Sequence, residues 1–186
     1  MTSIIRWIGL FIATLATIVI TGVITGCATS LDGERYRNDA PPFDLFTFFE
    51  GDVKAWGIVQ NRSGELVQRF TVDIKGTVSG NQLTLDERFT YGLGSGVENR
   101  VWEISRTADG TYRGTAGDIL GNASGQSFGN AFRWAYEMDL PVGDSSYRVR
   151  FEDWIWALDD QTLMNRSYIQ KFGLDFAEVT IFMQRQ

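Results

Sequence analysis

Apolar and polar residues alternate with a period of two through most of the chain after residue 43. The longest run places Phe132, Trp134, Tyr136, Met138 and Leu140 at every second position, between charged or small residues. This period is typical of antiparallel strands that bury one face and expose the other. Shorter runs with the same period occur at 69–74, 83–91 and 147–151.

Turn-forming residues separate these runs at short intervals, which gives about nine or ten strands. The only helical turn that we expect after the N-terminal region covers 43–49, just before the first strand. We therefore predict an all-β fold, a single antiparallel barrel that is closed or nearly closed, because closure removes exposed strand edges. A two-sheet sandwich is the alternative. The turn signals are at 61–64, 76–80, 109–110, 143–144, 159–160 and 173.

One strand changes phase along its length. Tyr147, Val149 and Phe151 are at odd positions, whereas Trp154 and Trp156 are at even positions. A β-bulge near residue 153 would carry this change and bend the strand. We predict such a bulge, with both tryptophans on the inner face.

Composition and charge disfavour one class of partner and exclude several classes of catalytic and metal site. The 186 residues include 17 basic and 23 acidic side chains, a formal net charge of -6, which disfavours nucleic acid as a partner. The chain has no His and one Cys. This excludes Ser-His-Asp and Cys-His catalysis, His-ligated metals, Cys-based zinc sites and internal disulfides. Because no cofactor motif is present either, we expect neither a cofactor nor a metal.

The N-terminal region has the pattern of an export signal. Arg6 is followed by a largely apolar stretch without charge over 7–24, and small residues follow it. The residues Ile24-Thr25-Gly26-Cys27 resemble the lipobox of bacterial lipoproteins. An uncleaved transmembrane anchor is the alternative reading of the same stretch.

The lipobox resemblance implies a domain organisation and a location. Residues 1–26 would be a signal peptide, and Cys27 would be acylated and hold the protein on a membrane. Ala28 is similar to the form directed to the outer membrane, so the implied location is the periplasmic face of that membrane. Residues 27–42 then form the lipidated Cys and a flexible tether, and 43–186 form the barrel domain.

The start of the barrel domain resembles the calycins, the lipocalins and fatty-acid-binding proteins. Phe49 and Gly51 are followed by Trp56 on the first strand. The resemblance implies that Trp56 is an aromatic plug that closes the barrel base. It also implies that Arg166 lies over this plug in a cation–π contact.

Over nearly all of 43–182 the chain resembles an uncharacterised family of bacterial lipoproteins, the domain-of-unknown-function family three-eight-three-three. The resemblance implies a location in the cell envelope and a barrel-like fold, and it implies no activity. The motifs that carry it are Phe48-Phe49, Ala55-Trp56-Gly57, Arg69-Phe70, Gly129-Asn130-Ala131, Trp134-x-Tyr136, Leu140-Pro141-Val142, Asp153-Trp154, Asn165-Arg166 and Lys171-Phe172-Gly173.

One carboxylate falls on an inner face. Glu87 shares its side of a strand with Leu85 and Phe89, so it must be paired, hydrogen-bonded or protonated. Arg100 or Arg106 on the next strand could meet it. The pair is either a structural ion pair or a weak candidate for an acid–base site.

The aromatic residues could line a cavity if the barrel is not completely filled. The periodicity leaves open whether the interior is filled or hollow. Our candidate lining residues are Trp102, Trp134, Tyr136, Trp154 and Trp156.

The Gly-rich segment over 114–129 lacks the spacing of a phosphate-binding loop or a dinucleotide fingerprint. We interpret its glycines as strand bends and points of close backbone approach at a barrel corner. Asp118 and Asp153 could form a pair of carboxylates at the barrel rim, with a calcium or sugar role as the functional alternative.

Three functional hypotheses remain. The first is a lipid-anchored barrel that binds a fatty acid or another apolar small molecule. The second is an envelope partner protein whose filled barrel presents its outer surface. The third is a barrel isomerase or cyclase in which Glu87 acts as the general acid or base. The sequence does not establish an enzyme, and the first hypothesis is the one that we favour.

Overall fold

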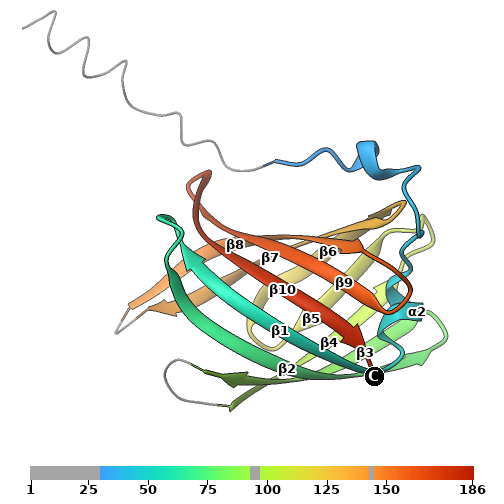
Figure 1. Ribbon diagram of the computed structural model, residues 1–186, viewed down its shortest axis with the longest axis horizontal. Helices are drawn as coiled ribbons and strands as arrows, with labels where there is room; N and C mark the ends of the chain where they lie inside the picture. The colour runs from blue at the N-terminus through green and yellow to red at the C-terminus, as the bar shows by residue number, and fades with distance from the viewer. Residues whose placement is uncertain (1–29, 93–96, 143–144) are drawn as a thin grey trace, which may run out of the picture.

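The computed structural model describes residues 30–92, 97–142 and 145–186. Within these ranges the chain forms two short helices and ten strands (Figure 1). The helices are η1 (Gly33–Tyr36), a 3₁₀ turn, and α2 (Leu45–Phe49). The strands are β1 (Gly51–Asn61), β2 (Leu66–Ser79), β3 (Gln82–Tyr91), β4 (Val97–Arg106), β5 (Tyr112–Ala116), β6 (Ile119–Phe128), β7 (Ala131–Val142), β8 (Ser145–Ala157), β9 (Thr162–Lys171) and β10 (Leu174–Arg185).

The strands form one closed antiparallel barrel. Each strand pairs with its neighbours in the chain, and β1 pairs with both β2 and β10, so the sheet has no free edge. Ala55, for example, lies opposite Val72 on β2 and Met183 on β10. The predicted all-β closed barrel is confirmed, and the sandwich alternative is wrong.

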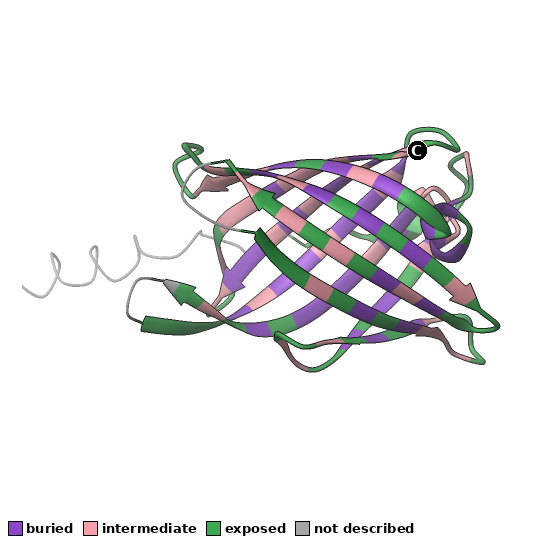
Figure 2. Cartoon of the chain, turned by 90° about the horizontal axis from the view of Figure 1, so that it is seen from below, coloured by how far each residue is buried: buried purple, intermediate pink, exposed green. Residues whose placement is uncertain are grey.

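Buried residues alternate with more exposed ones along much of the barrel wall, most regularly on β2 (Figure 2). The run on β7 turns Phe132, Trp134, Tyr136 and Met138 into the barrel, as the periodicity predicts. The Phe132 side chain is only 1% exposed. The side chains that face inward from all sides form one continuous apolar core.

Helix α2 closes one end of the barrel, and it is the helical turn that we predict before the first strand. Asp44 caps it, accepting a hydrogen bond from the backbone N of Thr47 at 2.9 Å. Its apolar residues are buried, including Phe48 and Phe49. Arg185 at the end of β10 donates to the carbonyl oxygens of Phe48 and Glu50, each at 3.0 Å, which fixes α2 on the barrel.

The aromatic plug predicted at Trp56 is wrong. This side chain is 43% exposed on the outer face of β1, beside Phe182. Val53 and Ala55 are the inward residues of the strand, so an even-numbered residue must point outward. The phenylalanines of α2 close the barrel end instead.

Arg166 also lies on the outer face, so the predicted stacking on Trp56 is wrong as well. Its Nη1 donates to the carboxylate of Glu178 at 2.7 Å. In the register of β9 and β10, Arg166 lies opposite Thr180, whereas Trp56 lies opposite Phe182. The partner of Arg166 is therefore a carboxylate rather than an aromatic ring.

The bulge predicted near Asp153 does not occur. Throughout its described length β8 keeps an unbroken register with β7, from Ala131↔Trp156 to Val142↔Ser145. Odd positions therefore face inward along the whole strand, which turns Asp153 into the barrel and Trp154 and Trp156 outward. The apparent change of phase reflects apolar residues on the outside of the barrel wall.

The segment before α2 covers these outward tryptophans. The Tyr36 ring lies 6.0 Å from Trp154 and 6.1 Å from Trp156, measured between ring centroids. Together with Leu31, Phe128 and Tyr168, it belongs to a second, smaller apolar cluster outside the barrel. Residues 30–42 run along the barrel wall to α2 (Figure 1). This part of the predicted flexible tether is therefore packed against the domain.

The predicted signal peptide at 1–26 and the acylated Cys27 lie outside the described residues. Within the ranges that are described, no helix has both the length and the apolar character needed to cross a membrane.

Close approach of the Trp134 ring explains two glycines of the Gly-rich segment. A Cβ added at Gly125 would lie 2.4 Å from the Trp134 ring, and one at Gly114 would lie 2.8 Å from it. Both strands therefore leave room for an indole that crosses their inner face. The strand β6 also shifts register between Leu120 and Ser124.

Candidate functional site

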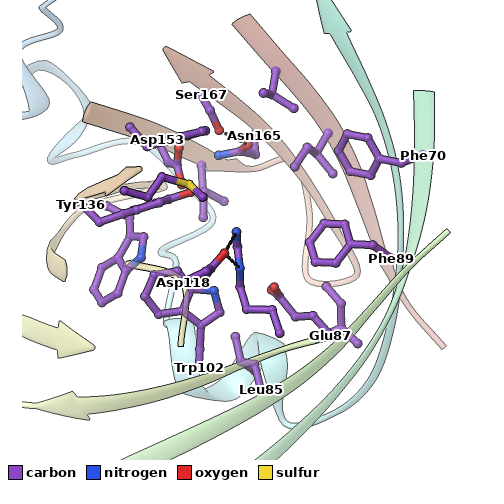
Figure 3. Close-up of a pocket in the computed structure, with 18 of the residues that line it drawn as sticks. Phe70, Leu85, Glu87, Phe89, Trp102, Asp118, Tyr136, Asp153, Asn165 and Ser167 are labelled. Atoms are coloured by element: carbon purple, nitrogen blue, oxygen red, sulfur yellow. Dashed lines mark hydrogen bonds and ion pairs between the residues drawn. The ribbon is translucent and has the colours of Figure 1, made fainter. Parts of the chain in front are cut away.

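The barrel is hollow. A cavity of about 470 Å³ extends from Leu45 and Phe49 of α2 toward the opposite end, where Tyr91, Leu140 and Pro141 line it. Most of the lining is aliphatic or aromatic, with a small group of polar side chains (Figure 3). The sequence leaves open whether the interior is filled, and the structure contains a cavity there.

Three of the predicted lining aromatics face this cavity. The Trp102 ring lies 5.6 Å from Trp134 and 5.3 Å from Tyr136, both in edge-to-face contact. Tyr136 also stacks on Phe151 at 5.0 Å. These contacts hold the rings as one aromatic wall.

The other two predicted lining residues do not reach the cavity. Trp154 and Trp156 are on the outer face of β8, in the cluster with Tyr36. Their assignment to the lining depended on the bulge near Asp153, which the unbroken register excludes.

Glu87 faces the interior, as the alternation on β3 predicts. It lies opposite Arg100 in the register of β3 and β4, and its carboxyl lines the cavity (Figure 3). Burial raises the pKa of Glu87 to about 7, and the positive charge of Arg100 limits the rise. A carboxyl with this pKa exchanges its proton near neutral pH.

Arg100 has a hydrogen-bond partner that periodicity did not predict. Its Nε and Nη2 donate to Oδ2 of Asp118, at 2.9 Å and 2.5 Å. The guanidinium also lies 5.7 Å from the ring centroid of Phe89 and 5.8 Å from that of Trp102. Arg100 is therefore held between two rings and a carboxylate. Asp118 is in the turn between β5 and β6, where no alternation marks it.

Arg106 does not reach Glu87, so the second predicted partner is wrong. It lies at the α2 end of β4, where its Nη2 donates to Oδ2 of Asp44 at 2.6 Å. Its guanidinium lies 4.9 Å from the centroid of the Phe46 ring. Arg106 fixes the helix that closes the barrel.

Asp118 and Asp153 both line the cavity, rather than forming a pair of rim carboxylates. Burial raises the pKa of Asp153 to about 7, and the positive charge of Arg100 opposes the rise. The Oδ1 atom of Asp153 is buried, and it has no hydrogen-bond partner among the described residues. Such an atom is costly unless a ligand or water satisfies it.

Two polar lining residues on β9 were not among our sequence candidates. The Ser167 hydroxyl donates to Oδ1 of Asn165 at 3.1 Å, and Nδ2 of Asn165 donates to the carbonyl oxygen of Trp154 at 3.4 Å. Both residues lie on the inner face of β9 between Leu163 and Ile169. They interrupt an apolar face in the same way as Glu87 does, so the sequence pattern marks them as well.

Within the described part of the chain, no group of three or more His, Cys, Asp or Glu side chains is arranged to hold a metal ion. The cavity combines apolar walls with two carboxyls, Glu87 and Asp153, that ionise near neutral pH, an arrangement suited to binding or to proton transfer.

The raised pKa values predict how stability depends on pH. In the unfolded chain Glu87 and Asp153 ionise near their ordinary pKa values of 4.5 and 3.8, but in the barrel they ionise near 7. The folded state then binds more protons between about pH 4 and 7, so stability falls as the pH rises through this window.

Glu87→Gln should therefore flatten this fall and raise the Tm at pH 8 by several degrees, with little change at pH 4. Thermal unfolding followed by circular dichroism between pH 4 and 8 measures the difference. Asp86→Asn, which changes the exposed neighbour on the outer face, should retain the wild-type profile. A profile that Glu87→Gln leaves unchanged would show that Glu87 ionises at its ordinary pKa.

Comparison with known proteins gives a family and a fold. Residues 21–185 match the model of a family described as "Protein of unknown function (DUF3833)". An S-type phycobiliprotein lyase CPES from Guillardia theta has a similar structure, with a TM-score of 0.53 and 13% identity. The match covers 76% of this chain and 90% of the lyase, and it shows a shared calycin-like barrel. No curated protein sequence matches the chain significantly.

Proposed function

The chain belongs to the DUF3833 family of proteins of unknown function, and we propose that it binds an apolar small molecule or lipid inside its barrel. One observation carries the proposal, which is the cavity of about 470 Å³ with its aromatic wall and few polar groups. Ligand sites commonly have volumes of about 300–1,000 Å³ and this mixture of side chains. The similar lyase supports the barrel fold alone, because 13% identity carries no ligand from one protein to the other.

The end of the barrel opposite α2 suits an apolar ligand that enters there. Several apolar side chains are exposed where strands begin at this end, and Phe172 in the β9–β10 turn is 89% exposed. Exposed apolar side chains gathered around a cavity often mark a site of interaction with an apolar partner. The others are Leu66, Val67, Val97, Tyr147 and Phe176.

A neutral apolar fluorophore tests the binding proposal. The purified domain should bind N-phenyl-1-naphthylamine saturably, with micromolar affinity, and its tryptophan emission should fall because Trp102 and Trp134 lie at the cavity wall. Trp134→Ala should weaken binding about tenfold, or about 1.4 kcal/mol, by removing ring contacts. A fluorescence titration measures both effects.

Trp56→Ala is the matched control, because it removes a tryptophan from the outside of the same barrel. Its affinity should equal that of the wild type. Equal losses in the two variants would place the dye on the outer surface, and absence of saturable binding would remove the binding proposal.

A second candidate is proton-transfer catalysis by Glu87, such as an isomerisation or cyclisation. The specific observation in its favour is a carboxyl inside the cavity with a pKa of about 7, which is the range in which a general acid or base is most effective. Glu87→Gln would abolish turnover of a bound compound while it retained dye binding. The partner-protein hypothesis assumes a filled barrel, and it loses this premise because the barrel is hollow.

We also propose that the protein is held by lipid on Cys27 at the periplasmic face of the outer membrane. The supporting observations are the residues Ile24-Thr25-Gly26-Cys27, with Ala28 after them. Cys27→Ser should abolish incorporation of labelled fatty acid and leave the uncleaved protein in the inner membrane, as membrane fractionation would detect. Wild-type processing and outer-membrane fractionation of this variant would overturn the proposal.

A further inference from the structure

The carboxyls inside the barrel outnumber the cations. Among the described residues that line the cavity, Glu87, Glu98, Asp118 and Asp153 carry carboxyls, and Arg100 carries the one positive charge. They come from β3, β4, β8 and the β5–β6 turn, so the excess surrounds the cavity rather than following one strand. Figure 3 shows Glu87 and Asp153 on different sides of Asp118.

The single cation is already neutralised. Both Nε and Nη2 of Arg100 donate to the same oxygen of Asp118, and the rings of Phe89 and Trp102 lie beside the guanidinium. A ligand carboxylate would have to compete with Asp118 for these donors, in a site where like charges repel strongly. Arg100 is thus poorly available as an anchor for an acidic ligand.

The remaining carboxyls have capacity to accept hydrogen bonds. Oδ1 of Asp153 is buried and accepts no hydrogen bond from the described part of the chain, and the hydrogen bonds of Arg100 go to Asp118 rather than to Glu87. Nearer the mouth, Glu98 accepts a hydrogen bond from the Tyr91 hydroxyl at 3.1 Å. Among the carboxyls that line the cavity, Glu87 and Asp153 are therefore the acceptors left for a ligand.

From this arrangement we infer that the ligand is an apolar molecule with a hydrogen-bond-donating, cationic head such as a protonated amine, and that the cavity discriminates against fatty acids. The inference rests on the proposed binding function and specifies its ligand class. An ammonium group would donate to Asp153 and Glu87 and offset the excess of carboxyls, while the aliphatic part would contact the aromatic wall. A carboxylate head would add a further negative charge beside them and leave Oδ1 of Asp153 unsatisfied.

The affinity for a protonated amine should also depend on pH. An ammonium beside Glu87 and Asp153 favours their charged forms, so binding releases protons and affinity for an amine rises between pH 6 and 8. The other ionisable groups that face the site are Arg100, Asp118, Glu98, Tyr91 and Tyr136. Arg100 has a raised pKa, and burial raises the pKa of Tyr91 to about 12 and that of Tyr136 well above 10, so all three keep their protons in this range.

Three compounds with the same chain length test the inference. Dodecylamine, dodecanol and dodecanoate each compete with N-phenyl-1-naphthylamine for the purified domain at pH 7.5, below their aggregation limits. Dodecylamine should displace the dye at a concentration at least about tenfold lower than dodecanoate, with dodecanol between them. Equal or stronger displacement by dodecanoate would overturn the inference, and so would failure of dodecylamine to displace bound dye.

Isosteric variants assign the preference to the carboxyls. Asp153→Asn and Glu87→Gln should each reduce the ratio between dodecylamine and dodecanoate by about threefold to tenfold, and they should leave displacement by dodecanol almost unchanged. Asp86→Asn, a carboxyl on the outer face beside Glu87, should keep the wild-type ratio. A preference that survives both inner substitutions would contradict the inference.

The dye separates the two levels of failure. If the wild-type domain does not bind N-phenyl-1-naphthylamine, the proposed binding function itself fails. If the dye binds but the amine has no advantage over the acid, the function stands and the ligand class inferred from the carboxyls is wrong.

Discussion

Trp154→Ala is expected to lower the free energy of unfolding by about 3–5 kcal/mol, although the side chain lies on the outside of the barrel wall. Trp154 is only 1% exposed because Tyr36, Phe128 and Leu31 cover it. Its removal leaves a cavity the size of an indole between the wall and the N-terminal segment. Urea denaturation followed by fluorescence of the remaining tryptophans measures the loss.

Two comparisons show whether the covering segment is the cause. Trp56→Ala, which removes an outer tryptophan that is 43% exposed, should cost less than about 1 kcal/mol. Tyr36→Ala should be destabilising in the wild type and much less so with Trp154→Ala, because the two rings are in contact. Additive effects, or equal costs for Trp154→Ala and Trp56→Ala, would mean that residues 31–36 do not cover Trp154 in solution.

The alternation of apolar and polar residues predicts the strands and the closed barrel because a period of two is imposed by the backbone itself. It also assigns faces correctly where one face is purely apolar, as on β7. It fails where both faces carry aromatic residues. On β8 the outer face bears Trp154 and Trp156, so the rule that large aromatic residues belong inside assigns both to the wrong face. Asp153 faces inward instead, because the strand has no bulge and inward residues stay at odd positions, as at Val149 and Phe151.

Trp56 illustrates the same limit at the start of the barrel. Its assignment as a plug followed from resemblance rather than from parity, and parity with the buried Val53 and Ala55 places it outside. The true closure comes from α2, whose five residues are too few to show a helical period. Local sequence pattern therefore predicts a helical turn there but not where its side chains pack.

The candidate site was predictable to the extent that its polar residues interrupt apolar alternation. Glu87 was found in this way, and Asn165 and Ser167 follow the same rule. The partner of Arg100 was not predictable, because Asp118 lies in a turn and comes close to Arg100 only through the pairing of β4 with β5. Contacts that depend on barrel closure, including the position of Asp153 relative to Arg100, require the three-dimensional structure.

Gly76→Ala is expected to destabilise the protein by about 3 kcal/mol, a large effect for the addition of one methyl group. A Cβ at this position of β2 would lie 1.6 Å from the carbonyl oxygen of Phe49 and 2.7 Å from its carbonyl carbon. These are backbone atoms at the end of α2, so no side-chain rotation can relieve the overlap. Either α2 must move away from the barrel end or β2 must bend.

Displacement of α2 would also open the closed end of the cavity, because Leu45 and Phe49 line it there. We therefore expect Gly76→Ala to weaken dye binding along with stability, even under conditions in which the domain remains folded. Gly117→Ala is the matched control, since a Cβ at Gly117 meets no atom within 4 Å. Its unfolding free energy should stay within about 0.5 kcal/mol of the wild-type value. Urea denaturation measures the free energy of unfolding of both variants. Equal stability of the two would show that β2 and α2 do not approach this closely.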